Sequence, residues 1–195
     1  MIYRSFNEGL FNSSKGRKVP DSYYKLCEDI LSYVEKNIGD LKYNDMMFSK
    51  IEKVKDNKVF KTSINAIKKL VVNTKKNNKS SCRFIIYPYA ESANEVWKIL
   101  MGIQSKFKLR NRERSDSILR NVIQRNEVAL YRKEDNGSYT VVSMSVFVTT
   151  SYGMECGVNT ITINIKNYED EDKAKKKLNL KENANYGIFS NTDFI

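Results

Sequence analysis

The chain has 195 residues, of which 41% are hydrophobic and 29% are charged, so it can bury a core but is too short for a large multidomain machine. Its 34 lysines and arginines against 23 acidic residues give a net charge of +11, which favours anionic partners. The chain has no histidine, which excludes Ser–His–Asp and Cys–His catalysis and zinc chemistry through histidine ligands.

The cysteines and the N-terminal region bear on the cellular compartment. Cys27, Cys82 and Cys156 are far apart and never in CxxC spacing, so they indicate neither a zinc knuckle nor a disulfide framework. The first residues lack the apolar core of a signal peptide, and no run of about 18 apolar residues occurs. We therefore expect reduced thiols and a cytoplasmic location, in a host cell or a virion if the source is viral.

The N-terminal part of the chain has helical periodicity. Apolar residues recur at three- and four-residue steps after Pro20, which predicts an amphipathic helix over 20–38. A less regular helix is predicted around 43–55, and a third helix is predicted to start at Thr62 or Ser63. We interpret residues 20–80 as a helical part.

The period changes at residue 81, where short apolar runs and alternating patterns begin. Asn136-Gly137 favours a tight hairpin turn, and Ser92 with Glu95 forms a capping box. The predicted elements of residues 81–181 are a strand at 82–87, a helix at 92–108, a helix starting at Ser115 or Asp116, strands at 127–133, 138–150 and 160–166, and a final helix at 170–180. Residues 182–195 are interpreted as a tail.

These elements predict an α+β fold: an N-terminal helical part followed by a mainly antiparallel sheet of about four strands, with helices packed on one face. Ahead of it, residues 1–19 contain the basic run Lys15-Gly16-Arg17-Lys18 and are interpreted as a flexible basic arm that becomes ordered on a partner.

The positive charge is concentrated in two blocks. Residues 50–79 contain ten lysines against Glu52 and Asp56, and residues 98–133 contain ten lysines or arginines against three acids. Arginine binds phosphate with two hydrogen bonds, whereas lysine acts more as a point charge. The residues predicted to bind nucleic acid are Lys15, Arg17, Lys18, Lys68, Lys69, Lys75, Lys76, Lys106, Lys108, Arg110, Arg112, Arg114, Arg120 and Arg125.

The function expected from these patterns is that of a non-enzymatic basic protein that binds nucleic acid, such as RNA, or a nucleoprotein electrostatically. This function depends on the two basic blocks, residues 50–79 and 98–133, lying on one surface of the protein. A structural, matrix or assembly role in a virus or phage would fit, with self-association of the chain. An anionic membrane surface would bind the same lysine and arginine side chains. We expect no cofactor, no resident metal and no small-molecule substrate, and the glycines form no nucleotide-binding loop.

Two other functions remain open. One is a metal-dependent phosphodiesterase that uses Glu127, Glu134 and Asp135. The other is a protein-interaction module in which the charge belongs to a solvated surface. Aromatic residues such as Tyr87 and Tyr131 could stack on unpaired bases from an exposed sheet face, or they could pack across strands.

Overall fold

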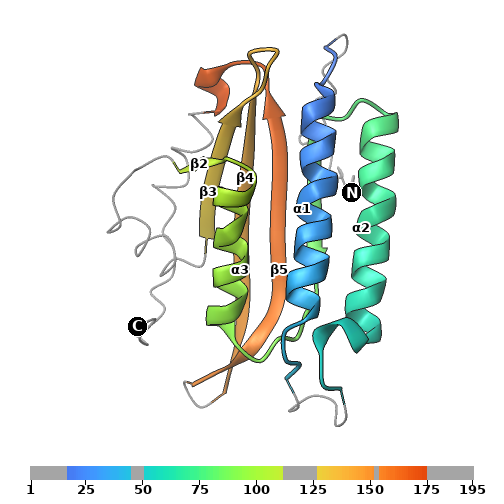
Figure 1. Ribbon diagram of the computed structural model, residues 1–195, viewed down its shortest axis with the longest axis vertical. Helices are drawn as coiled ribbons and strands as arrows, with labels where there is room; N and C mark the ends of the chain where they lie inside the picture. Colours follow the sequence, from blue (N-terminus) through green and yellow to red (C-terminus); the bar gives the residue numbers. More distant parts are fainter. Residues whose placement is uncertain (1–16, 45–50, 112–126, 152–153, 175–195) are drawn as a thin grey trace, which may run out of the picture.

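The computed structural model describes residues 17–44, 51–111, 127–151 and 154–174. They form two layers, a five-stranded antiparallel sheet and a row of three helices on one of its faces (Figure 1). The elements in chain order are α1 (Asp21–Gly39), the 3-10 turn η1 (Val54–Asp56), α2 (Lys58–Lys76), β1 (Ser81–Ile86), α3 (Ala93–Lys106), β2 (Arg110–Asn111), β3 (Glu127–Lys133), β4 (Tyr139–Ser151) and β5 (Met154–Tyr168).

The sheet has the strand order β1-β5-β4-β3-β2, with every neighbouring pair antiparallel. Four of the strands are long, and β2 has only two residues. The predicted α+β fold with about four strands is therefore confirmed. The first long strand and the last lie side by side, because β1 pairs with β5 at the edge of the sheet.

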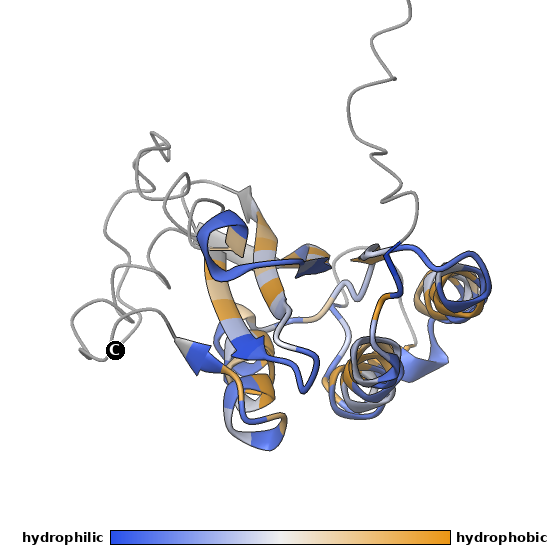
Figure 2. Ribbon diagram, turned by 90° about the horizontal axis from the view of Figure 1, so that it is seen from above, coloured by the Kyte–Doolittle hydropathy of each residue, from blue (hydrophilic) through white to orange (hydrophobic). Residues whose placement is uncertain are grey.

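The helices follow from apolar stripes and from capping residues. α1 buries Tyr23, Ile30 and Val34 along one side and confirms the helix predicted over 20–38. α3 begins after Ser92, whose hydroxyl oxygen accepts a hydrogen bond from the Glu95 backbone N–H at 3.3 Å. Seen from above, the helices line one side of the sheet, with α2 at the end of the row beyond α1 (Figure 2).

The helix predicted around 43–55 is wrong for the described part of that segment. Lys42 forms an isolated β-bridge with Lys53, and Tyr43 forms one with Ala90. Only the three residues Val54–Asp56 are helical there, as a 3-10 turn. Long-range backbone pairing therefore outweighs the local spacing of apolar residues.

α2 starts four residues before the predicted Thr62. Asn57 is its cap: the side-chain oxygen accepts hydrogen bonds from the backbone N–H groups of Val59 at 2.6 Å and Phe60 at 3.2 Å. An asparagine cap satisfies N–H groups that the first helical turn leaves without intrahelical partners. The helix therefore includes Lys58 and Lys61.

The strands at 127–133 and 138–150 form the predicted hairpin. Of the Asn136-Gly137 pair only Gly137 has a positive φ, +80°, and its N–H donates to the Glu134 carbonyl at 2.9 Å. This is a short loop with glycine in the left-handed position. The strand predicted at 160–166 is longer than expected, because β5 begins at Met154.

One hydrophobic core joins the two predicted halves of the chain. It contains side chains of all three helices and of the inner face of the sheet, including Val34, Ile64, Phe84, Leu100 and Ile163. Two free thiols, those of Cys27 and Cys82, are buried in it.

Several expectations fall at the borders of the described residues. Residues 1–16 of the predicted arm, the helix starting at Ser115 or Asp116, and the tail at 182–195 lie outside them. Val19, at the end of the arm, is only 1% exposed and donates its N–H to the Asn78 side chain at 3.0 Å. The predicted final helix begins at Glu171 and is described as far as Ala174.

Candidate nucleic-acid interface

The exposed side of α2 gathers the lysines of the first basic block. The opposite side of the helix is buried, and it carries Phe60, Ile64, Ile67 and Val71. Because side chains seven residues apart lie on the same side of a helix, Lys61, Lys68 and Lys75 form one line. The exposed lysines of this helix, which we call the lysine face, are Lys58, Lys61, Lys68, Lys69, Lys75 and Lys76.

The lysine face has little opposing charge. From Asn57 to Ala90 the chain contains seven lysines, one arginine and no acidic residue. Within the described part of the chain, the only one of the six side chains in an ion pair is Lys68, whose Nζ lies 2.8 Å from Glu35 Oε1 of α1. The remaining ammonium groups are therefore available to an anionic ligand.

The C-terminal end of α2 carries further cations. The Asn78 side chain donates a hydrogen bond to the Arg17 carbonyl at 2.7 Å and so fixes the chain before α1 next to the end of α2. Lys18 and Lys79 are exposed in these two segments. The Arg17 guanidinium donates to the Asn167 side chain on β5. The structure thus brings Arg17 and Lys18, from the predicted arm, to the end of the lysine face.

The second basic block lies elsewhere. Lys106 ends α3, Lys108 follows it, and Arg110 begins β2. α2 packs on β1, and β1 and β2 are the two opposite edges of the sheet. The described members of the two blocks therefore do not share one surface, contrary to expectation. Lys15, Arg112, Arg114, Arg120 and Arg125 lie outside the described residues.

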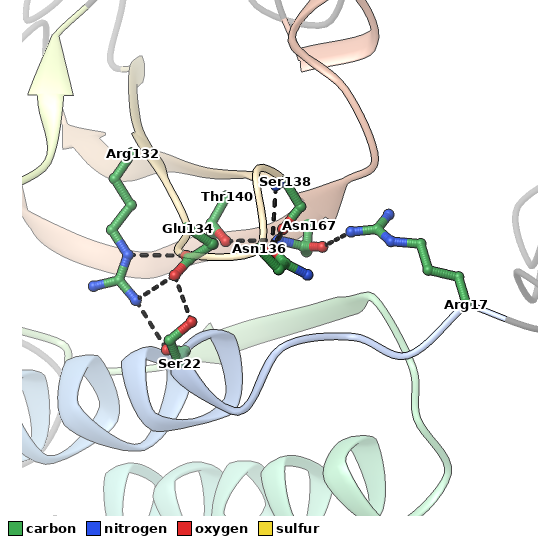
Figure 3. Close-up of polar contacts among 8 residues, drawn as sticks. All are labelled: Arg17, Ser22, Arg132, Glu134, Asn136, Ser138, Thr140 and Asn167. Atoms are coloured by element: carbon green, nitrogen blue, oxygen red, sulfur yellow. Dashed lines mark hydrogen bonds and ion pairs between the residues drawn. The ribbon is translucent and has the colours of Figure 1, made fainter.

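The acidic residues proposed for phosphodiester cleavage have different environments. Glu134 is 5% exposed and its carboxylate accepts hydrogen bonds from Arg132 Nε at 2.9 Å and from the Ser22 hydroxyl at 2.6 Å (Figure 3). Arg132 also donates to the Ser22 carbonyl at 2.9 Å. Asp135 is exposed in the hairpin loop, and the side chain of Glu127 is outside the described part.

The contacts of Glu134 set its charge. Burial raises the pKa of its carboxyl, but hydrogen bonds from Arg132, Ser22 and Thr140 outweigh burial, so the pKa lies below its ordinary value. The carboxylate is therefore ionised and held between the hairpin and the start of α1. Across the described ranges, no three acidic, cysteine or histidine side chains are placed to hold a metal ion.

A hydrogen-bonded chain of side chains continues from this carboxylate across the hairpin (Figure 3). The amide nitrogen of Asn167 donates to the hydroxyl oxygens of Ser138 and Thr140, both at 3.0 Å. Ser138 in turn donates to the Asn136 side chain at 2.6 Å. These polar groups have partners within the protein, so the cluster stabilises the fold and leaves no donor set for a ligand.

Lys58 and Lys61 are not among the residues predicted to bind nucleic acid, because the predicted helix starts after them. The signal that could have found them is Asn57, a cap residue directly before the pattern. A comparison of the chain with models of protein families, with curated proteins and with solved structures found no match. None of the described helices is long and apolar enough to cross a membrane.

Proposed function

We propose that this chain is a non-enzymatic nucleic-acid-binding protein that holds its ligand electrostatically through the lysine face of α2. The observation that supports the proposal best is that five of the six lysines of this face have no ion-pair partner among the described residues. Free ammonium groups in a row attract a phosphate backbone and release its condensed counterions.

The size of the lysine face suits a run of phosphates. Lys58 and Lys76 are 18 residues apart, which corresponds to about 27 Å along a helix. At roughly 3.4 Å of helix axis per phosphate of one duplex strand, that length spans about eight phosphates. Arg17, Lys18 and Lys79 extend the positive charge beyond the C-terminal end of α2.

The contacts to phosphate carry no base sequence information, so binding of this kind is largely independent of sequence. Arg112, Arg114, Arg120 and Arg125 remain predicted contributors from the second block. The role in viral or phage assembly also stays a prediction from composition. The phosphodiesterase alternative loses support from Glu134, because Arg132 and Ser22 occupy its carboxylate.

The test replaces three lysines of the face that form no ion pair with any described residue. We expect the variant Lys61→Gln, Lys69→Gln, Lys76→Gln to bind labelled DNA more weakly than the unchanged protein. The slope of log K against log salt is negative, and its magnitude should decrease by about 2 to 3, because each phosphate contact contributes about 0.7 to 0.9. Fluorescence anisotropy over a salt series measures both quantities.

The matched control removes the same charge from other helices. Lys25 and Lys36 on α1 and Lys98 on α3 are exposed, and the triple glutamine variant at these positions lowers the net charge equally. Its salt slope should stay close to that of the unchanged protein. Equal losses for both triple variants would show that net charge acts without a defined surface, and would contradict the proposal.

A further inference from the structure

The face of the sheet turned away from the helices carries a second set of exposed side chains. We call it the outer face. On β5 the side chains of Ile161, Ile163 and Ile165 enter the core, so those of Thr160, Thr162 and Asn164 point the other way. The outer face is therefore defined by alternation along each strand.

Cross-strand register sorts the outer face into rows. Residues directly opposite each other share a face. One row consists of Arg83, Asn164 and Ser143, and the next consists of Ile85, Thr162 and Ser145. In the third row Thr160 lies opposite Phe147. Tyr87 directly follows β1 and continues the alternation of its exposed side chains. Hydroxyl and amide groups therefore lie between an arginine and two aromatic rings.

Phe147 is the most unusual residue of these rows. It lies within β4 but is 62% exposed, although phenylalanine is one of the most often buried residue types. Its register is interrupted directly afterwards, between Phe147 and Val148, as in a β-bulge. Bulges are common beside binding sites, where they redirect a side chain.

Two other large side chains accompany Phe147. Tyr87 is 38% exposed and Ile85 is 37% exposed, both at the β1 edge. Phe147 and Tyr87 are two strands apart, which corresponds to about 10 Å at the usual strand spacing. The outer face thus presents two rings with a polar row beside them, and aromatic rings in this setting can stack on unpaired bases.

The charge of the outer face is mainly positive. Arg83 belongs to it. Lys166 and Arg110 also belong to it, because cross-strand pairing places them in one row with Val141 and Tyr131. Lys166 and Arg110 lie in the row of Val141, so of these three cations Arg83 is the one that the register places nearest to Tyr87 on β1.

The acidic cluster after β5 is distant from the rings. Glu169, Asp170 and Glu171 follow Tyr168, which pairs with Tyr139 at the other end of β4. Tyr139 and Phe147 are eight residues apart, or about 27 Å along a strand. At that end Ala174 packs on Val141 and covers the sheet. The open part of the outer face is therefore the part with Phe147, Tyr87 and Arg83.

We infer that this open part binds single-stranded nucleic acid, with unpaired bases stacked on Phe147 and Tyr87 and phosphate held by Arg83. The inference rests on the proposed function and adds the class of ligand, since paired bases are not available for stacking. Ser145, Thr160 and Thr162 supply hydrogen-bonding groups for base edges between the rings.

The experiment compares two oligonucleotides of equal length and charge, one of thymidine and one with abasic sites throughout. Phe147→Ala should weaken binding of the thymidine oligonucleotide by roughly five- to 100-fold, the range for loss of one stacked base, and leave the abasic one unchanged. Phe147→Leu should behave like the alanine variant, and Phe147→Trp should retain binding. Anisotropy titrations at one salt concentration measure these affinities.

Leu70→Ala is the matched control, because Leu70 is exposed on α2, outside the sheet and on a different side of the helix from the lysine face, and should affect neither oligonucleotide. Ultraviolet cross-linking of the unchanged protein to the thymidine oligonucleotide gives an independent readout, and we expect the cross-link on the peptide that contains Phe147. A cross-link that maps only to other peptides would contradict base stacking.

The outcomes separate this inference from the proposed function. Equal affinity of Phe147→Ala and the unchanged protein for thymidine, with weak binding by the α2 lysine variant, would overturn the inference and leave the lysine face supported. Loss of self-association in Phe147→Ala, with unchanged affinity, would assign the outer face to a second copy and also overturn it. If the unchanged protein bound neither oligonucleotide, the proposed function itself would be wrong.

Discussion

At the scale of single residues, Glu134 shows how contacts decide the role of an acidic side chain. Its position beside a hairpin loop fits a metal ligand as well as a structural carboxylate. The structure gives it Arg132, Ser22 and Thr140 as partners, and these belong to β3, α1 and β4. It therefore ties three elements together, which no local pattern in the sequence could show.

The ionisation of Glu134 predicts a dependence of stability on pH. The pKa of its carboxyl is lower in the folded protein than the ordinary value of 4.5. The ionised carboxylate therefore stabilises the folded protein above pH 4.5, and this stabilisation is lost as pH falls through the folded-state pKa. Glu134→Gln should lower the free energy of unfolding by about 2–3 kcal/mol at pH 7, less than for a fully buried pair because Arg132 is partly exposed. Urea denaturation at pH 7 and at pH 3 measures the difference, which should shrink at pH 3.

The control for this prediction is Asp135→Asn. Asp135 is the exposed neighbour of Glu134 in the same loop, and a surface change of this kind alters the free energy of unfolding by about 0.5 kcal/mol or less. A difference between Glu134→Gln and the unchanged protein that stays constant from pH 7 to pH 3 would show that the carboxylate charge is not the cause.

Gly157 is a second residue whose role depends on distant contacts. Its φ is +129°, and a Cβ at this position would lie 2.6 Å from the carbonyl oxygen of Ala90. That oxygen accepts the N–H of Val158 at 2.8 Å. Gly157→Ala should destabilise the protein by about 2–4 kcal/mol, through backbone strain and a clash with backbone.

Gly137→Ala separates these two causes. Gly137 also has a positive φ, but a Cβ there meets nothing within 4 Å, so only strain of about 1–2 kcal/mol is expected. Thermal and urea unfolding of both variants measure the difference. Equal effects would show that the approach to Ala90 contributes nothing.

At the scale of elements, the start of α2 determines how many lysines the lysine face contains. The cap residue Asn57 is 3% exposed and holds the first turn, and the turn carries Lys58 and Lys61. Lysines in the last turn, Lys75 and Lys76, are also favourable for the helix itself, because they lie at the negative end of its dipole.

Removal of this cap should weaken the helix. Asn57→Ala leaves the N–H groups of Val59 and Phe60 without their acceptor, and we expect a loss of about 1 kcal/mol in the free energy of unfolding. Urea denaturation measures it. Asn65→Ala, at an exposed position within α2, is the control and should be neutral or slightly stabilising, because alanine favours helices. An equal loss at both positions would contradict the capping role.

The sequence predicted α1, β1, α3 and the β3–β4 hairpin because each has a local signal, such as the Ser92 cap or the Asn136-Gly137 turn. The errors occur where distant segments decide the structure. Tyr43 pairs with Ala90, 47 positions away in the chain, so the spacing of Met46 and Ile51 could not reveal that Tyr43 lies in a β-bridge.

At the scale of the whole molecule, the net charge of +11 does not show that the positive side chains are unevenly distributed over the surface. The periodic pattern of the sequence places Lys68, Lys69, Lys75 and Lys76 on one helix, and all four are exposed on α2. It could not tell that α2 and Arg110 lie at opposite edges of the sheet, because strand order is a property of long-range pairing. Phe147 is not among the residues predicted to bind nucleic acid, since an alternating pattern does not show which of the two faces of a sheet the helices cover.

The pairing of β1 with β5 also bears on how the chain is made. Cys82 lies opposite Ile165, so β1 finds its hydrogen-bonding neighbour only after about 80 further residues have been synthesised. At 5–20 residues per second, that delay is roughly 4–16 s. Until β5 has been synthesised, Phe84 and Ile86 are outside the ribosome but lack the neighbouring strand whose Ile163 and Ile161 lie opposite them. Chaperones can bind the nascent chain during this delay, because β1 and β5 can pair only late in translation.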